Sequence, residues 1–577
     1  MSVLGHLVFM ISWVFYVLTW NNTGTSIVYP VIVFPAAAYG LMWLAAFFAG
    51  RLSGEKLGPL LKQESSLLVV FALLSLSPLM LKLNIPDPHN FTQRKLEIVM
   101  GGTYVLYLAA LSAWFFTTLA RQGVINTAGE KTLLKIIAVF FFVFYFALSL
   151  WLNYANEPAG DEPIYLLTAH SIIYDRDLNL KNNYEKKDYA SYYSRELKSQ
   201  ETERAGKLYS YHPVLSSVII APFYALAGRA GATLAANTIA ALAIALLFLF
   251  LLKTGETMQT AFFTAGIAGF FTPAMSFSNQ LCADVLSGVL VLAVFIIILY
   301  YPRKLLVGAI IAALLPWAHV RNLIIWGVLG IILIVEYFGK NIKTGAGAVK
   351  EKRINIKELI IFGAIQGLSF GLWVWFNFVH YGSFIPRQTQ ADIKMAEAFS
   401  INIKGVLGLM FDQEFGAFIY VPLMALCFAG VVFLYKKNKK LFWYSLAVFV
   451  PYFAVIASWL DWRGGGGAFP RLLLPVLFII YLWLSQVISK LNKTVLYLTY
   501  SGLAISLIMA ALPWFRWNKG LGWNWILRMI ENTTHIEVTA LFPSLWTGTL
   551  VSNILTLLFW LVVVVAGNIY IINKRRG

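Results

Sequence analysis

The sequence predicts an all-α polytopic membrane protein, a bundle of about 16 transmembrane helices with outer-face loops that form an active-site cavity. Three observations predict this fold class. The chain is 59% hydrophobic and only 12% charged, whereas soluble domains carry about 25% charged residues. Apolar runs of about 18 residues or more, enough to cross a bilayer, recur along the chain. Its 19 Trp and 28 Tyr residues suit the two membrane–water interfaces.

Each long apolar run is expected to form one helix, and the connections between them are mostly short. The segment Pro213–Ala227 is apolar but interrupted by proline, which is typical of a short re-entrant or interfacial helix. The expected helices are Val3–Trp20, Ile27–Gly50, Leu67–Leu83, Ile98–Ala120, Leu133–Leu152, Ala232–Leu252, Thr260–Met275, Cys282–Tyr300, Leu305–Ala318, Leu323–Phe338, Leu359–His380, Ala417–Tyr435, Leu441–Trp459, Leu472–Ile488, Val495–Leu512 and Leu550–Ile572.

The net charge of +18 is explained by membrane orientation. If the N-terminus is cytoplasmic and the segments alternate, the inner segments carry a net charge of about +17 and the outer segments about +1. Basic loops such as Lys436–Lys440 then lie inside. We therefore expect a multi-pass protein of the plasma membrane with both termini cytoplasmic. The basic balance needs no nucleic-acid partner, and the expected partners include membrane lipids.

The first long outer segment, Asn153–Tyr211, begins with the adjacent carboxylates Asp161 and Glu162. Neighbouring carboxylates repel each other, and a low dielectric at the membrane surface disfavours their charge. Either effect can raise a carboxylate pKa toward the range of a general base. The structural alternative is a solvated pair that caps the helix starting at Pro163. His212, directly after this segment, is a candidate for substrate or phosphate binding.

Two further acidic segments lie on the expected outer side. Asp175 and Asp177 have the spacing of an Asp-x-Asp pattern that can hold a divalent cation, which leaves such a cation open as a cofactor. The alternative is a turn with an internal pair to Arg176. Asp412 precedes another helix and is a third acidic candidate, with an N-terminal helix cap as its alternative.

Arginines on the same side could bind an anion. Arg321, with His319 nearby, lies between two apolar runs, where an arginine is costly unless it is paired or lines a polar cavity. Its planar guanidinium suits phosphate, although it could also reach the interface as a lone side chain. Arg463 and Arg471 flank four glycines that include Gly465. Such glycines can expose N–H groups to an anion, although the run could be a linker.

These segments together resemble the GT-C superfamily of membrane glycosyltransferases, which includes the protein O-mannosyltransferases and the aminoarabinose transferases. The motif GDEPIY contains Asp161 and Glu162, at the position where those families carry an acidic pair. YHPVLSSVIIAPFYAL resembles their return into the membrane core. FNFVHYGSFIP, DQEFGAFIYVPL and RGGGGAFPRLLLPVL resemble later segments of related predicted transferases. The similarity covers roughly Leu133 to Gln486, and the order of the segments is more specific than any one motif.

The resemblance implies that a sugar is transferred from a polyprenyl-phosphate donor to a glycan, lipid or protein acceptor on the outer face. It also implies that a carboxylate of the acidic pair removes the acceptor's proton and that the anomeric centre is inverted. The choice of Asp161 as this base and of Glu162 as its support is our inference from their positions. The leaving phosphate would need positive charge and N–H donors.

The resemblance divides the chain into three parts. Residues 127–490 form the expected catalytic core, 491–577 supply further membrane segments, and 1–126 form an accessory module outside the resemblance. The main alternative function is a transporter or lipid flippase, which usually needs ionisable residues near the middle of the bilayer. The apolar runs are nearly free of such residues. A non-catalytic scaffold is a second alternative, but it would not need these outer Asp, His and Arg residues.

Overall fold

The structure is a computed structural model, and it describes most of the chain from Phe91 to Lys574. The described part is residues 91–574 without 122, 199–200, 343–353, 384–401, 490–492 and 519. The expected helices before residue 90 lie outside it.

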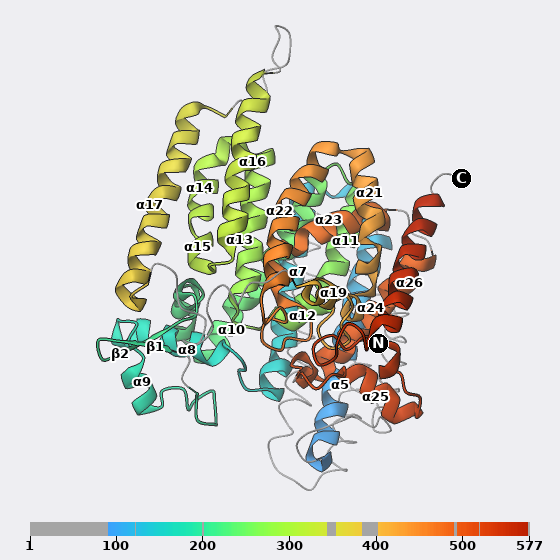
Figure 1. Cartoon of the computed structure of the whole chain (residues 1–577), viewed down its shortest axis with the longest axis horizontal. Coiled ribbons are helices and arrows are strands. Elements are labelled where there is room, and N and C mark those ends of the chain that lie inside the picture. Colours follow the sequence, from blue (N-terminus) through green and yellow to red (C-terminus); the bar gives the residue numbers. More distant parts are fainter. Residues whose placement is uncertain are drawn as a thin grey trace.

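The described chain is mostly helical (Figure 1). Its first half contains α5 (Phe91–Arg121), α6 (Val124–Thr127), α7 (Glu130–Ala155), α8 (Glu162–His170), η4 (Ser171–Asp175), α9 (Lys181–Lys186), α10 (Val214–Lys253), α11 (Met258–Phe270), α12 (Thr272–Phe277), α13 (Ala283–Tyr300), η5 (Pro302–Lys304), α14 (Leu305–Ala313), α15 (Leu315–Ala318) and α16 (Asn322–Ile342). Its second half contains α17 (Ile356–Tyr381), α19 (Ile403–Phe411), α20 (Ala417–Tyr420), η6 (Pro422–Leu426), α21 (Cys427–Lys437), α22 (Lys439–Ser458), η7 (Arg471–Val476), α23 (Leu477–Ile488), α24 (Lys493–Ala511), η8 (Pro513–Arg516), α25 (Trp525–Thr534), η9 (Thr539–Leu541) and α26 (Ile554–Asn573).

One antiparallel hairpin departs from the all-α expectation. Strands β1 (Glu201–Arg204) and β2 (Lys207–Ser210) pair across a two-residue turn. Gly206 in this turn has a φ of +74°, a conformation that glycine adopts without strain. The hairpin lies beside α9 at one end of the bundle (Figure 1).

Nine helices of the described chain are long and apolar enough to cross a membrane, which indicates a membrane-embedded protein. Of the other predicted spans in this part, three are divided. Pro273, Pro316 and Pro422 each stand in the first turn of a new helix, where the apolar run continues but the helix does not. Proline lacks the N–H that would continue the preceding helix. Hydropathy alone predicted each divided pair as one continuous helix. The total of about 16 spans stays a prediction.

The long helix α10 contains the expected break near Ala227. Gly228 has a φ of +54°, and Ala227 also leaves the helical conformation. The segment from Val214 to this break is therefore a short helix of its own, as the proline pattern predicts. Beyond the break, α10 packs against α7, α11 and α13 in the centre of the bundle.

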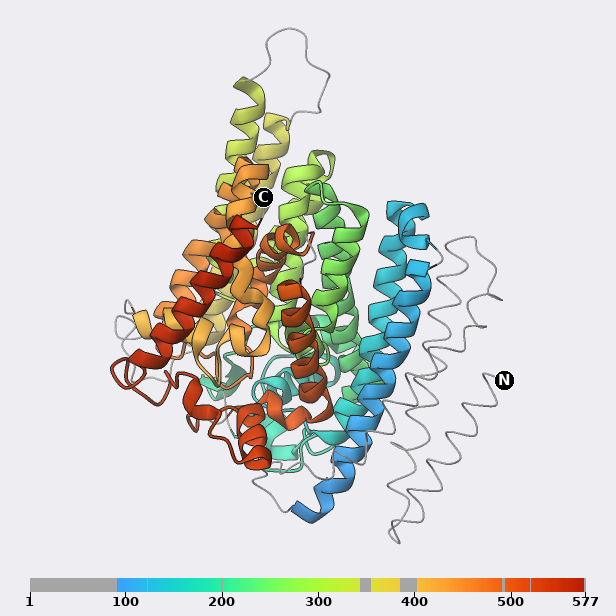
Figure 2. The same cartoon turned by 90° about the vertical axis from the view of Figure 1, so that its right-hand side faces the viewer.

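Close aromatic packing holds the middle of the bundle together. Phe141 of α7 lies against Gly269 of α11, where an added Cβ atom would approach the Phe141 ring to 2.2 Å. The Tyr145 hydroxyl donates a hydrogen bond of 2.9 Å to the carbonyl oxygen of Gly269. Trp151 of α7 fills the space left by Gly101 of α5. Figure 2 shows α5 and α7 side by side along one flank. The accessory role expected for residues 1–126 stays a prediction.

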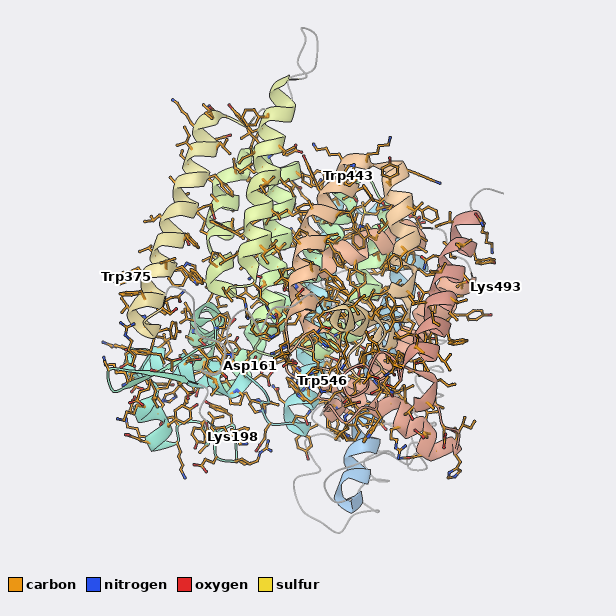
Figure 3. All side chains as sticks on the ribbon, viewed as in Figure 1. Asp161, Lys198, Trp375, Trp443, Lys493 and Trp546 are labelled. Carbon is orange, nitrogen blue, oxygen red and sulfur yellow. The ribbon has the colours of Figure 1, made fainter. Side chains whose placement is uncertain are left out.

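The two ends of the bundle differ in chemistry. Helices α8, α9 and α25 and the hairpin gather at one end, whereas the basic turn between α21 and α22 lies at the other (Figure 1). Asp161 and Trp546 are at the first end and Trp443 is at the second (Figure 3). The polar segments that the sequence assigns to the outer face therefore share one end, called the polar end below.

Candidate functional site

Asp161 is positioned by a tight turn between α7 and α8. Gly160 has a φ of +62°, and an added Cβ atom there would lie 3.2 Å from the ring of Trp517. A glycine is therefore needed both for the backbone and for the space. Asp161 is the N-cap residue of α8, but its carboxylate makes no capping hydrogen bond. The helix-capping alternative is thus wrong for Asp161, whose side chain points elsewhere.

The carboxylate of Asp161 pairs with Arg471, which lies 310 residues further along the chain. Oδ2 of Asp161 accepts a hydrogen bond of 3.1 Å from Nη1 of Arg471. The two side chains are 26% and 16% exposed, so a ligand can still reach them. The contact brings together two candidate residues that lie far apart in the sequence.

The ion pair sets the protonation state of Asp161. Burial by itself would raise the pKa of this carboxyl, but the Arg471 guanidinium, helped by His212, holds the pKa below its ordinary value. The expectation that carboxylate repulsion raises the pKa of Asp161 is therefore wrong, because its principal neighbour is a cation. As it stands, the pair holds an ionised but weakly basic carboxylate.

A second ion pair lies close enough to act on the first. Arg321 pairs through Nη2 with Oδ1 of Asp284, the second residue of α13. The backbone N–H of Arg321 also donates a hydrogen bond of 3.2 Å to Nδ1 of His319. The positive charge of Arg321 contributes to the lowered pKa of Asp161. The arginine between the two apolar runs is thus paired and is not a lone side chain.

Both arginines retain an unused hydrogen-bond donor. The Nε atoms of Arg321 and Arg471 are buried and have no hydrogen-bond partner among the described residues. Buried polar groups are normally paired, so two unpaired guanidinium donors near one carboxylate are unusual.

Two histidines complete the surroundings of Asp161. Burial lowers the pKa of His212, against the opposing effect of the Asp161 charge. Burial, together with the charges of Arg321 and Arg471, holds the pKa of His319 well below its ordinary value. Both imidazoles are therefore neutral near pH 7 and can accept as well as donate a hydrogen bond.

Glu162 faces a different environment from Asp161. Its two carboxylate oxygens accept hydrogen bonds from the backbone N–H groups of Ala159, at 3.1 Å, and Leu281, at 3.2 Å. Burial raises the pKa of Glu162, although the charges of Arg516 and Arg229 oppose this effect. Glu162 therefore fixes the start of α8 against the segment before α13, and it is the member of the pair whose pKa is raised.

The glycine run connects Arg471 to residues 512–553 between α24 and α26, called the C-terminal polar segment below. Gly464, Gly465 and Gly466 have φ values of +70°, +90° and +132°, which other residues rarely adopt. The carbonyl oxygen of Gly466 accepts a hydrogen bond of 2.7 Å from the N–H of Asn518. An added Cβ atom at Gly465 would lie 3.5 Å from Nη2 of Arg471. The loop is therefore folded around Arg471 and is not an extended linker.

Arg463, at the other end of the glycine run, is held by different partners. Its Nε donates a 2.7 Å hydrogen bond to Oδ1 of Asp461, and its guanidinium lies 3.5 Å from the centre of the Trp546 ring. The ring of Phe415 lies on another side, at 5.4 Å. Arg471 therefore contacts Asp161, whereas Arg463 packs on the ring of Trp546.

Asp412 and Glu414 attach the C-terminal polar segment to the bundle. Oδ2 of Asp412 accepts hydrogen bonds from the N–H groups of Leu545 and Trp546, at 2.6 and 3.0 Å. Its Oδ1 accepts from the N–H groups of Glu414 and Phe415. The carboxylate of Glu414 accepts from three backbone N–H groups between residues 520 and 522. Asp412 therefore links its own loop to the C-terminal polar segment and does more than cap a helix. No contact places it near Asp161.

Asp175 and Asp177 stabilise a turn. Oδ2 of Asp175 accepts hydrogen bonds from the amides of Asn182 and Asn183, at 3.0 and 2.7 Å. Oδ1 of Asp177 accepts from the hydroxyl of Ser171 at 2.9 Å. Among the described residues, no group of three or more His, Cys, Asp or Glu side chains is arranged to hold a metal ion. The pattern fits a folded turn, and metal dependence stays untested.

Three charged residues of the site were not among the sequence candidates: Asp284, Arg229 and Arg516. Asp284 pairs with Arg321. The sequence contained a signal for such a partner, because an arginine between two apolar runs requires an acidic residue nearby. Arg516 is buried, and its Nη1 donates a 2.7 Å hydrogen bond to the side-chain oxygen of Asn279. Nothing in the local sequence distinguishes Arg516 from an exposed loop residue.

The chain matches no family model, no curated protein and no solved structure.

Proposed function

We propose that this protein transfers a sugar from a polyprenyl-phosphate donor to an acceptor hydroxyl at its polar end, on the outer face of the membrane. The observation that carries the proposal is the Asp161–Arg471 pair, with the charge of Arg321 acting on the same carboxylate. A carboxylate base and an anion-binding group are what transfer from a phosphate leaving group requires. The resemblance to GT-C transferases agrees with this chemistry.

In the proposed reaction, the donor phosphate binds to Arg471 and Arg321. Two arginines offer several N–H donors in planar arrays that match phosphate oxygens. They would stabilise the charge that develops on the phosphate as the bond to the sugar breaks. The neutral imidazole of His319, which already accepts from the backbone of Arg321, supports the orientation of that side chain.

Binding of the phosphate would also activate the base. Arg471 lowers the pKa of Asp161, so an anion that shares Arg471 weakens this effect and raises the basicity of the carboxylate. Asp161 then takes the proton of the acceptor hydroxyl. The oxygen attacks the anomeric carbon, the bond from that carbon to the phosphate oxygen breaks, and its electron pair leaves with the polyprenyl phosphate. Attack from the face opposite the phosphate inverts the anomeric centre.

Glu162 has a positioning role in this proposal. Its carboxylate ties the turn before α8 to the backbone of Leu281 and so fixes the direction of the neighbouring Asp161. Catalytic groups must be held within a fraction of an ångström of their working positions.

A transporter or lipid flippase receives less support. The buried acids Asp284 and Glu336 form ion pairs with Arg321 and Lys440. An apolar cavity between α10, α13 and α23 is lined by no charged side chain. Ion-coupled transport needs ionisable groups that change partners within the membrane.

The direct test is sugar transfer by the purified full-length protein in nanodiscs. Polyprenyl-phosphate sugars that differ in the sugar are supplied with crude envelope acceptors, and radiolabelled product is separated from donor. Release of polyprenyl phosphate that depends on both acceptor and Asp161 would support the proposal. Movement of intact donor between leaflets without cleavage would support the flippase alternative instead.

A further inference from the structure

Residues 536–544, called the apolar loop below, lie between α25 and α26 within the C-terminal polar segment. The sequence of the loop is IEVTALFPS, and its only charged residue is Glu537. Ile536 and Leu541 are 62% and 57% exposed. Contact between water and large apolar side chains is unfavourable, and exposed apolar groups that lie together usually mark a binding surface. The apolar loop therefore needs an apolar partner that the described residues do not supply.

The apolar loop folds back along α26 and does not rise above its end. The indole N–H of Trp560 donates a hydrogen bond of 2.8 Å to the carbonyl oxygen of Leu541. The Trp560 ring also stacks on the ring of Phe542, with 4.9 Å between the ring centres. Trp560 is the seventh residue of α26, which begins at Ile554. At a rise of about 1.5 Å per residue, this contact lies about 9 Å along the helix from its start. Leu541 is therefore level with the second turn of α26.

Helix α26 is long and apolar enough to cross a membrane. It has 20 residues, the length that crosses a hydrocarbon core of about 30 Å, and few of them are buried in the bundle. Figures 1 and 2 show α26 at the edge of the bundle. Its exposed residues Leu555, Leu558 and Phe559 are in the same two turns that the apolar loop runs beside. The loop thus extends the apolar surface of a membrane-spanning helix, which favours lipid over a second protein as its partner.

Gln413, in the connection between α19 and α20, pairs with the backbone of the apolar loop. A non-helical backbone can lie in lipid only where its polar groups have partners within the protein. The side-chain Nε2 of Gln413 donates hydrogen bonds to the carbonyl oxygens of Thr539 and Phe542, at 3.4 and 3.2 Å. Its backbone N–H donates to the carbonyl oxygen of Pro543 at 2.8 Å. Together with the Leu541 carbonyl described above, four carbonyl oxygens of the loop are paired without water.

The charged residues near the apolar loop indicate how deep it can lie. The side chain of Glu537 is exposed, and an ionised carboxylate is costly to move into lipid. The start of the loop is also tied to α25, because the hydroxyl of Thr539 donates a hydrogen bond of 2.9 Å to Oε2 of Glu531. The start of the loop therefore belongs at the level of the lipid headgroups, and Leu541 belongs deeper.

We propose that the apolar loop dips into the membrane leaflet at the polar end, with Leu541 among the lipid acyl chains and Glu537 among the headgroups. The acyl chains cover the exposed apolar side chains, while Gln413 and Trp560 supply the hydrogen bonds that water would supply to a solvated loop. The C-terminal polar segment is thereby anchored in the membrane between its two flanking helices. This contact is independent of sugar transfer, so failure of the proposed function would leave it unchanged.

The test is spin-label accessibility in phospholipid nanodiscs that each hold one full-length protein. The label is attached at Leu541→Cys in a chain that also carries Cys282→Ser and Cys427→Ala, since these are its two native cysteines. Collisions of the label with molecular oxygen, which concentrates among acyl chains, are compared with collisions with a nickel chelate, which stays in water. Val562→Cys, exposed on α26, is the lipid control. Lys198→Cys, exposed at the polar end (Figure 3), is the water control.

The ratio of oxygen to chelate collisions at Leu541→Cys should exceed that at Lys198→Cys roughly threefold or more, because apolar oxygen partitions into lipid. It should approach the ratio at Val562→Cys. Ile536→Cys is a second variant and should give an intermediate ratio. Ratios at both loop positions equal to that at Lys198→Cys would place the loop in water and overturn the proposal. Low collision rates with both reagents would also overturn it, because protein and not lipid would then cover the loop. Thermal unfolding identifies a misfolded variant, and the other loop position then decides.

Discussion

Asp161 and Arg471 join two polar segments of the chain by a 3.1 Å ion pair at one end of the helix bundle. This pair lowers the pKa of Asp161, so the carboxylate is charged but weakly basic until another anion engages Arg471. Binding of the donor phosphate to Arg471 would then raise the pKa of Asp161 and make it a stronger base. The following predictions separate this role from purely structural ones.

Replacing Asp161 by Asn should abolish transfer. The amide has the size of the carboxylate but cannot take the acceptor's proton, and loss of a general base typically costs about 100- to 10,000-fold in rate. The measurement is transfer from a defined lipid-linked sugar in nanodiscs, with donor binding followed separately. Asp177→Asn is a matched control, because Asp177 only supports a turn. Near-normal transfer by a folded Asp161→Asn variant would remove Asp161 from the mechanism.

Replacing Glu162 by Gln should act mainly on stability. Glu162 accepts two backbone hydrogen bonds, and an amide can accept only one of them well, which costs about 1–3 kcal/mol for a donor left unpaired. We expect a lower midpoint of thermal unfolding and a milder loss of transfer than in Asp161→Asn. A variant with unchanged stability but no transfer would instead indicate that Glu162 acts directly on the substrate.

The fold and the site were predictable to different degrees. Hydropathy located the apolar segments, but prolines such as Pro273 divide helices without interrupting the run of apolar residues. The acidic turn at Asp161 and the position of Arg321 between two apolar runs were visible in the sequence. The sequence did not show which of the two arginines beside the glycines contacts Asp161. Both arginines have the same local context, and tertiary packing determines which one forms the pair. Asp284 was not among the sequence candidates, although Arg321 required a partner.

Replacing Arg463 by Ala should lower stability without weakening donor binding. The Arg463 guanidinium packs on the Trp546 ring and pairs with Asp461, and such a cation–π contact is worth about 0.5–2 kcal/mol. The free energy of unfolding should therefore fall, while the KM for the lipid-linked donor should stay the same. If KM rises several-fold while the unfolding transition is unchanged, Arg463 belongs to the phosphate site after all.

Replacing Arg471 by Gln should move the acidic limb of the pH–rate profile to higher pH. Arg471 opposes the effect of burial on Asp161, so without it the pKa of this carboxyl rises, and the base is protonated and inactive at pH values where the wild-type protein still works. The measurement is kcat/KM from about pH 4 to about pH 8, which reports the free enzyme. Overall activity will also fall because the phosphate loses a partner, so the position of the limb is compared, not its height. Arg463→Gln should leave that position unchanged. An unshifted limb in Arg471→Gln would show that the ion pair does not control the base.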